Sequence, residues 1–212
     1  MVTQRRRSFT RSAAAVGLIL CAVALISGAG HLAAQAKLSK EDAARFQAKL
    51  VIIEKNAATP RKGKAARTTQ VSDGEVNSYL KYLAGAQVPV GIVDPTLHAA
   101  GSGRVTGRAI VDLDAVRTQK KRAWTDPLGY LMGKLPVTAA GTLTTKDGVG
   151  QFKLESAEIS GVTMPKSLLQ ELLSYYSRTA ENPSGINMDD PFALPASIRE
   201  IRVGQGSAVI VQ

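Results

Sequence analysis

Cysteine, histidine and aromatic residues are scarce in this 212-residue chain. It has one cysteine, two histidines, one tryptophan and 5% aromatic residues. Residues 37–212 contain no cysteine and one histidine, His98, so this part forms no disulfide and lacks the thiolate and imidazole ligands of zinc sites. A Ser-His-Asp triad would have to use His98, and no G-x-S-x-G motif accompanies it. We therefore expect a non-enzymatic protein with no catalytic residue, no metal site and no cofactor.

Acidic residues are absent from the first 36 positions. Residues 5–11 contain four arginines, residues 13–29 are apolar and uncharged, and Ala-Gln-Ala at 34–36 is a small-x-small sequence. This order is typical of a secretory signal peptide, cleaved here before Lys37. An uncleaved anchor is the alternative, although the run is barely long enough to span a bilayer. We expect a periplasmic or extracellular protein, exported by the Sec or the twin-arginine route.

Basic residues outnumber acidic ones, 27 to 17, and the formal net charge is +10. An exported basic protein is better suited to lipid head groups, acidic glycans or cell wall than to nucleic acid, and we expect no nucleic-acid partner. Cations gather in two clusters, the second beside the single tryptophan, and form the candidate surface-binding set: Arg61, Lys62, Lys64, Arg67, Arg117, Lys120, Lys121, Arg122 and Trp124. Such clusters suit an anionic membrane surface or an envelope protein; solvated loops and a tryptophan in the core are the alternative.

Helical signals open the mature chain. Ser39 and the apolar spacing that follows it predict a helix over about 40–55, and residues 56–69 read as a basic loop. Ser72 and Glu75 then form a capping box for a short helix that ends near Gly85. We therefore divide the chain into a signal peptide (1–36), an N-terminal helix with a basic loop (37–69) and a main domain (70–212).

Alternating apolar and polar residues predict antiparallel strands after Gly85. One strand runs from about Arg104 to Leu113, preceded by another that ends in a turn at 101–103, and a third covers about 135–145. Lys146-Asp147-Gly148 predicts a hairpin turn. The returning strand changes parity near Ser156, which indicates a bulge that bends the sheet.

A proline-started helix and a closing hairpin complete the pattern. The helix begins near Pro165 and presents a leucine stripe, and a hairpin over 198–211 turns at Gly204-Gln205-Gly206. We therefore expect an α+β fold with a curved antiparallel β-sheet wrapped around a long amphipathic helix, plus additional N-terminal helices.

Small residues dominate the presumed inner face of the sheet. They include Gly107, Ala109, Ala139 and Gly141. Because protein interiors are close-packed, something must fill the space above them. Either a protein helix lies close to the sheet, or a bound acyl chain occupies the space; glycine can also mark a simple bend.

The order of these elements resembles the exported bacterial proteins of the tubular lipid-binding (TULIP-like) family. The stretches that carry the resemblance are SDGEVNSYL from Ser72, ISGVTMPKSLLQELL from Ile159, and PFALPASIREIRVGQGSAVI near the end. The resemblance covers about residues 70–212. It implies a curved sheet around a helix with an apolar groove for lipid tails, and no catalytic residue.

We therefore predict a monomer that binds or carries a lipid or similar amphiphile in the cell envelope, in an apolar groove between sheet and helix. An envelope scaffold domain with a filled core is the alternative, and a hydrolase of envelope polymers is less favoured. The candidate ligand-binding residues are apolar and come from two helices and three strands: Val76, Leu80, Leu83, Val111, Leu113, Val137, Leu143, Phe152, Leu154, Leu168, Leu169, Leu172, Leu173 and Tyr176.

Overall fold

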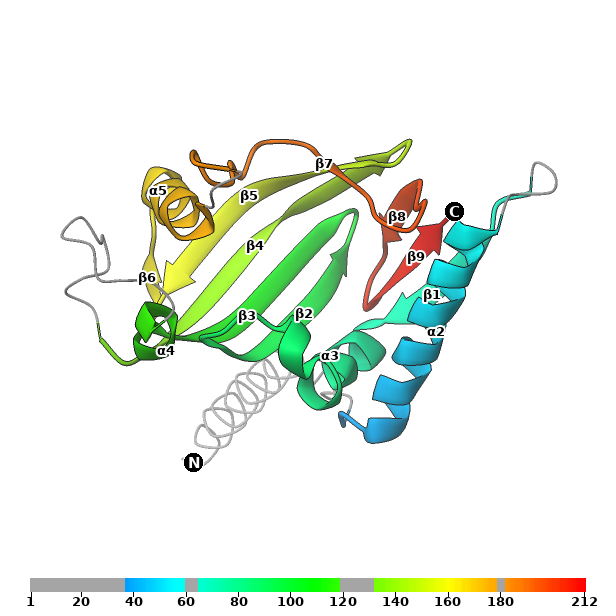
Figure 1. The fold of residues 1–212 in the computed structure, drawn as a ribbon, viewed down its shortest axis with the longest axis horizontal. Helices are drawn as coiled ribbons and strands as arrows, with labels where there is room; N and C mark the ends of the chain where they lie inside the picture. The colour runs from blue at the N-terminus through cyan, green and yellow to red at the C-terminus, as the bar shows by residue number, and fades with distance from the viewer. Residues whose placement is uncertain (1–36, 60–64, 119–131, 179–181) are drawn as a thin grey trace, which may run out of the picture. The chain divides into compact units, whose positions relative to one another are not determined.

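The computed structural model describes residues 37–59, 65–118, 132–178 and 182–212. The chain separates into two compact units, Met1–Lys37 and Leu38–Gln212. The second unit is an α+β structure with a large antiparallel sheet (Figure 1). The predicted fold class is confirmed.

The large sheet has six strands, five in a ladder and one short strand paired beside it. The ladder runs β2-β3-β4-β5-β6, and β7 pairs with β5. All the pairings are antiparallel, so hairpins suffice to connect β2 with β3 and β4 with β5. The strands are β2 (Ile92–Gly101), β3 (Arg104–Asp112), β4 (Lys134–Lys146), β5 (Val149–Ile159), β6 (Val162–Thr163) and β7 (Phe192–Ala193).

Both predicted turns and the predicted bulge of this sheet are confirmed. The β2–β3 turn holds Gly101, Ser102 and Gly103 at φ of 86°, 52° and 80°, a left-handed geometry that glycine adopts without strain. Asp147 and Gly148 also have positive φ at the β4–β5 turn, as a tight hairpin requires. The β4–β5 register shifts between Ala140↔Ser156 and Gly141↔Leu154, so one extra residue bends β5 there.

A separate three-stranded sheet has the order β1-β9-β8. Its strands are β1 (Thr68–Ser72), β8 (Glu200–Val203) and β9 (Ser207–Val211). The β8–β9 hairpin is the predicted closing hairpin. The prediction of a loop up to residue 69 was wrong at its end, because Thr68 and Thr69 belong to β1 and pair with Val211 and Ile210. This pairing joins two segments that are far apart in the chain, so the local pattern contained no sign of it.

Four α-helices and one 3₁₀ turn accompany the sheets in the described part of this unit. They are α2 (Lys40–Ala58), α3 (Asp73–Tyr82), η1 (Gly85–Gln87), α4 (Leu113–Thr118) and α5 (Lys166–Ser177). The Ser39 cap of α2 and the Ser72–Glu75 capping box of α3 are both present, as predicted. Pro165 is the N-cap residue of α5.

The best-buried core lies between α2 and the three-stranded sheet. Ile53 of α2 packs there with Val71, Ile198 and Ile210, all at most 9% exposed. Phe46 and Val76 pack against this cluster. The helix α2, which the sequence placed outside the main domain, therefore lies along the small sheet and supplies part of its core (Figure 1).

The predicted alternation of the strand β3 ends one residue early. Leu113 is the first residue of α4 and is 3% exposed, whereas the sequence predicted it as a strand residue facing a ligand. The Asp112 carboxylate accepts the backbone N–H of Ala115 at 3.0 Å, which is N-cap behaviour that starts a helix. Leu113 therefore fills the protein's own interior.

Candidate functional site

One face of the six-stranded sheet is almost entirely apolar. Directly opposite residues in an antiparallel ladder share a face, and the registers pair Val105 with Gly141, Gly107 with Ala139, and Leu143 with Phe152. The face formed in this way is called the apolar face below. Its members are Ile92, Leu97, Ala99, Val105, Gly107, Ala109, Val111, Leu135, Val137, Ala139, Gly141, Leu143, Phe152, Leu154, Ala157 and Ile159.

The large side chains of the apolar face all keep contact with solvent. Its only members under 9% exposure are the small residues Ala99, Gly141 and Ala157. Every valine, leucine, isoleucine and phenylalanine of the face is half-buried, except Leu97, which is 42% exposed. The small sheet differs, because its Val71, Ile210 and Val211 are buried. The apolar face is therefore a large hydrophobic surface that the described residues of the chain cover only in part.

Other elements meet the apolar face near two strand ends. At the β4–β5 hairpin, Thr145 exchanges hydrogen bonds of 2.8 and 3.1 Å with the main chain of Ile201. A Cβ added at Gly150 would lie 2.8 Å from the Phe192 ring, so this ring covers the glycine. The Asn77 side chain binds both the N–H and the carbonyl of Leu97, at 2.7 and 2.8 Å, and so fixes α3 to β2.

The predicted helix residues lie on two different helices. Leu168, Leu169, Leu172 and Leu173 of α5 are all half-buried, and α5 lies against β5 (Figure 1). In α3, Leu80 is half-buried, whereas Leu83 caps the helix and is 44% exposed. Val76 packs against the core of the small sheet.

Most of the predicted basic surface lies outside the described residues. These residues are Arg61, Lys62, Lys64, Lys120, Lys121, Arg122, Trp124 and the side chain of Arg117. The side chain of Tyr176, a predicted ligand-binding residue, also lies outside the described part. Arg67 is described and half-buried. Its Nη1 donates to the carbonyl oxygens of Asn56 and Thr59 at 3.0 and 3.4 Å, so Arg67 satisfies carbonyl groups at the C-terminal end of α2.

A pocket of about 470 Å³ lies where α2, the small sheet and the β4–β5 turn meet. We call it the arginine pocket, because Arg67 and Arg199 line it. The pairing of β1 with β9 brings Arg67 opposite Gln212, with main-chain hydrogen bonds of 2.9 and 3.1 Å. Arg199 donates its N–H to Val211 on the other side of β9, at 2.8 Å. The two arginines therefore flank one strand, with main chains about 10 Å apart.

Sequence reasoning missed this pocket. Arg67 and Arg199 are far apart in the chain, and only the pairing of β9 with two partners brings them together. A tight turn at residues 195–198 precedes Arg199. In it, Ala196 and Ser197 have φ of 53° and 54°, and the Ile198 N–H donates to the Pro195 carbonyl at 3.0 Å. Turns with two positive φ values favour glycine and asparagine, so alanine and serine gave no sign of this turn in the sequence.

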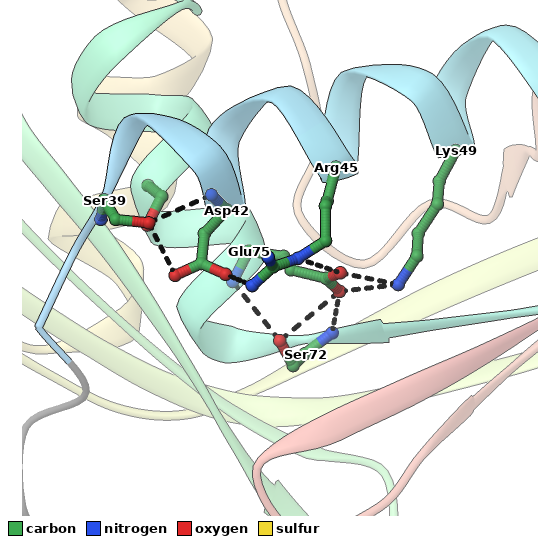
Figure 2. Close-up of polar contacts among 7 residues, drawn as sticks. Ser39, Asp42, Arg45, Lys49, Ser72 and Glu75 are labelled. Atoms are coloured by element: carbon green, nitrogen blue, oxygen red, sulfur yellow. Dashed lines mark hydrogen bonds and ion pairs between the residues drawn. The ribbon is translucent and has the colours of Figure 1, made fainter.

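A buried carboxylate joins α2 to α3. Glu75, 7% exposed, accepts two hydrogen bonds from the Lys49 ammonium at 2.7 and 2.8 Å and one from the Ser72 N–H at 3.0 Å (Figure 2). Burial acts to raise the pKa of Glu75, but the bonds from Lys49 and Ser72 outweigh burial and lower the pKa below 4.5. This contact holds α2 against the capping box of α3, and we assign it a structural role.

His98 also has a partner. Its Nδ1 lies 2.8 Å from an Asp73 carboxylate oxygen, and the same carboxylate accepts the Ala99 N–H at 3.1 Å. Asp73 thus links the start of α3 to β2. Within the described ranges, no group of three or more His, Cys, Asp or Glu side chains could hold a metal ion. No helix in those ranges has the length and apolar content needed to cross a bilayer.

Comparison with known proteins yields one distant structural overlap. No protein-family model and no curated protein matches the chain. The crystal structure of lipopolysaccharide binding protein overlaps at 12% sequence identity with a TM-score of 0.21, over 73% of this chain and 46% of that chain. This chain therefore spans less than half the length of that structure. So low a TM-score carries no argument, and the resemblance to the TULIP-like family stays a prediction.

Proposed function

We propose that this protein binds a lipid or similar amphiphile, without catalysis, by laying its acyl chain on the apolar face. The observation that carries the proposal is the incomplete burial of every large side chain of that face. Soluble proteins rarely leave so extended an apolar surface in contact with water unless something binds there. Each methylene that leaves water contributes about 0.8 kcal/mol.

The shape of the ligand follows from where the small residues lie. Ala139 has Gly107 and Ala157 as its register neighbours, so the middle of the apolar face is lined by backbone and methyl groups. Larger side chains, such as Val137 and Leu143, stand on either side along β4. This arrangement suits a narrow, extended hydrocarbon chain better than a bulky ring system. We assign Leu168, Leu169, Leu172 and Leu173 of α5 to the same ligand, because α5 packs against β5.

Two adjacent alanines of β4 offer a matched test. Ala139 lies on the apolar face and Ala140 on the opposite face, and both are half-buried. Ala139→Phe would place a ring over Gly107 and Ala157, in the space assigned to the acyl chain. We expect Ala139→Phe to weaken binding of a fluorescent fatty acid at least tenfold, and Ala140→Phe to leave binding unchanged. Equal affinities of the two variants for the fatty acid would contradict the proposal. It would also be contradicted if the wild type bound no fatty acid and native mass spectrometry showed no co-purifying lipid.

A second candidate function is supported by the outer side of α2. Ala44, Ala48, Val51 and Ile52 recur at helical spacing and are exposed, Val51 to 58% and Ile52 to 51%. This stripe would suit the alternative of an envelope interaction domain. In that case Val51→Glu should abolish a protein contact and leave fatty-acid binding intact.

We also propose that the binding takes place after export. The cationic start, the apolar run and the Ala-Gln-Ala sequence of residues 1–36 support this location. N-terminal sequencing of the protein from an extracytoplasmic fraction tests it. A chain beginning at Lys37 is expected, and an intact Met1 would contradict it.

A further inference from the structure

We propose that the arginine pocket binds an oxyanion, a phosphate or a carboxylate, and that it holds the charged head of the amphiphile whose acyl chain lies on the apolar face. The second half of this inference rests on the proposed function; the first half does not.

Among the described residues, the charged side chains that line the arginine pocket are both positive. They are Arg67 and Arg199. The remaining polar ones are Asn56, Thr59, Ser197 and Gln212. The Asp147 carboxylate lies 3.8 Å from the Arg199 guanidinium, but Asp147 does not line the pocket and its side chain is 70% exposed. So exposed a pair contributes little, and a stronger anion can replace it.

Among the described residues, the neutral side chains Asn56 and Gln212 bond to each other and to main-chain carbonyls, so the arginines are the donors that a ligand would meet. The Gln212 side chain donates to the carbonyls of Ile53 and Ala196, at 2.8 and 2.7 Å, and accepts from Asn56 at 3.0 Å. Arg67 uses Nη1 for the end of α2 and so compensates the negative end of the helix dipole. A guanidinium anchored through one nitrogen presents the rest of its planar fork in a fixed orientation, which suits an oxyanion.

Leu194 connects the pocket with the apolar face. It lines the arginine pocket, and its Cδ2 lies 3.3 Å from the position of a Cβ added at Gly150. Gly150 shares the parity of Phe152 and Leu154 on β5, so Leu194 contacts the side of the sheet that bears the apolar face. The β4–β5 turn residue Gly148 also lines the pocket. Leu194, which also packs against the core of the small sheet, therefore lies between the arginine pocket and the apolar face, and the proposal lays the ligand across it.

The experiment compares two amphiphiles with the same acyl chain, 1-oleoylglycerol and 1-oleoylglycerol 3-phosphate, together with inorganic phosphate. Arg199→Gln removes one exposed cation from the pocket; its side chain is 56% exposed, so folding should be unaffected. Arg202→Gln is the matched control, because Arg202 lies on β8, is 63% exposed and does not line the pocket. Circular dichroism of both variants checks that they fold as the wild type does.

We expect the wild type to bind the phosphorylated amphiphile more tightly than the neutral one. Arg199→Gln should weaken binding of the phosphorylated amphiphile on the order of tenfold, the effect of one charge-assisted bond. It should leave the affinity for 1-oleoylglycerol unchanged. Arg202→Gln should change neither. Equal effects of the two substitutions, or no preference of the wild type for the phosphate, would overturn the inference.

The inorganic phosphate arm separates this inference from the proposed function. If neither amphiphile binds but phosphate binds and Arg199→Gln abolishes that binding, the pocket is an oxyanion site, and the proposed function fails together with the second half of this inference. If 1-oleoylglycerol binds and neither phosphate species responds to Arg199→Gln, the proposed function stands and the oxyanion site is refuted. If nothing binds, both are refuted.

Discussion

Glu75 allows the sharpest prediction about stability. Its carboxylate is the buried joint between α2 and α3, and it accepts three short hydrogen bonds from Lys49 and the Ser72 N–H. Glu75→Ala removes the capping-box acceptor, which contributes about 1 kcal/mol, and the charge-assisted bonds to Lys49, which contribute roughly another 1.5 kcal/mol because Lys49 can return to water. We expect the free energy of unfolding to fall by about 2–3 kcal/mol.

Urea denaturation with a matched control measures this effect. The Lys166–Asp189 pair has nearly the same bidentate distances, 2.6 and 2.8 Å, but its side chains are 46% and 55% exposed. Asp189→Ala should therefore cost less than about 0.5 kcal/mol. If the two substitutions cost the same, burial is not what makes the Glu75 contact strong, and the reasoning fails.

The same contact predicts a dependence on pH. Burial alone would raise the pKa of Glu75, but the bonds from Lys49 and Ser72 lower it below 4.5 in the folded protein. A depressed pKa means that the carboxylate contributes stability above the unfolded-state pKa and loses that contribution as the pH falls through the folded-state pKa. The difference in stability between wild type and Glu75→Gln should therefore be complete near pH 6 and shrink below about pH 4.5. A difference that grows on acidification would contradict the assignment.

Four further substitutions test the fold. Gly141→Ala would place a Cβ against the Lys153 carbonyl oxygen and the Phe152 ring, and should lower the free energy of unfolding by about 2–3 kcal/mol. Gly107→Ala, whose Cβ would lie 3.6 Å from Leu97 Cδ2, should cost less than about 1 kcal/mol. A larger cost for Gly107→Ala than for Gly141→Ala would refute the registers. Asn77→Ala should cost about 1 kcal/mol by loss of both Leu97 bonds and increase amide exchange at the edge of β2; unchanged exchange would refute that role. Ala196→Gly should raise the free energy of unfolding by about 0.5–1 kcal/mol, because φ of 53° strains alanine, and a destabilisation would contradict this geometry.

Local chemistry explains which parts of the fold could be predicted from the sequence. The Ser72–Glu75 capping box, the turns at Gly101–Gly103 and Asp147–Gly148 and the bulge before Ser156 all depend on residues within a few positions of one another. The end of β3 was missed because Leu113 fits a strand and a helix equally well. Only the Asp112 side chain, which caps α4, decides between them.

Long-range pairing explains what could not be predicted. Residues Thr68–Ser72 form the strand β1 because they pair with β9, far along the chain. Their sequence, TTQVS, is as typical of a loop as of a strand. The arginine pocket depends on the same pairing. The apolar face could be predicted from alternation, whereas its incomplete burial could not, because burial depends on where α3, α5 and the small sheet lie.

Photochemical labelling tests the central claim most directly. A fatty acid with a diazirine near the end of its chain is bound to the purified protein, irradiated, and its adducts are located by peptide mass spectrometry. We predict adducts in residues 134–146 of β4 and 149–159 of β5 that an excess of unlabelled fatty acid removes. Adducts confined to the exposed stripe of α2, or adducts on the sheet that the competitor does not reduce, would contradict the account.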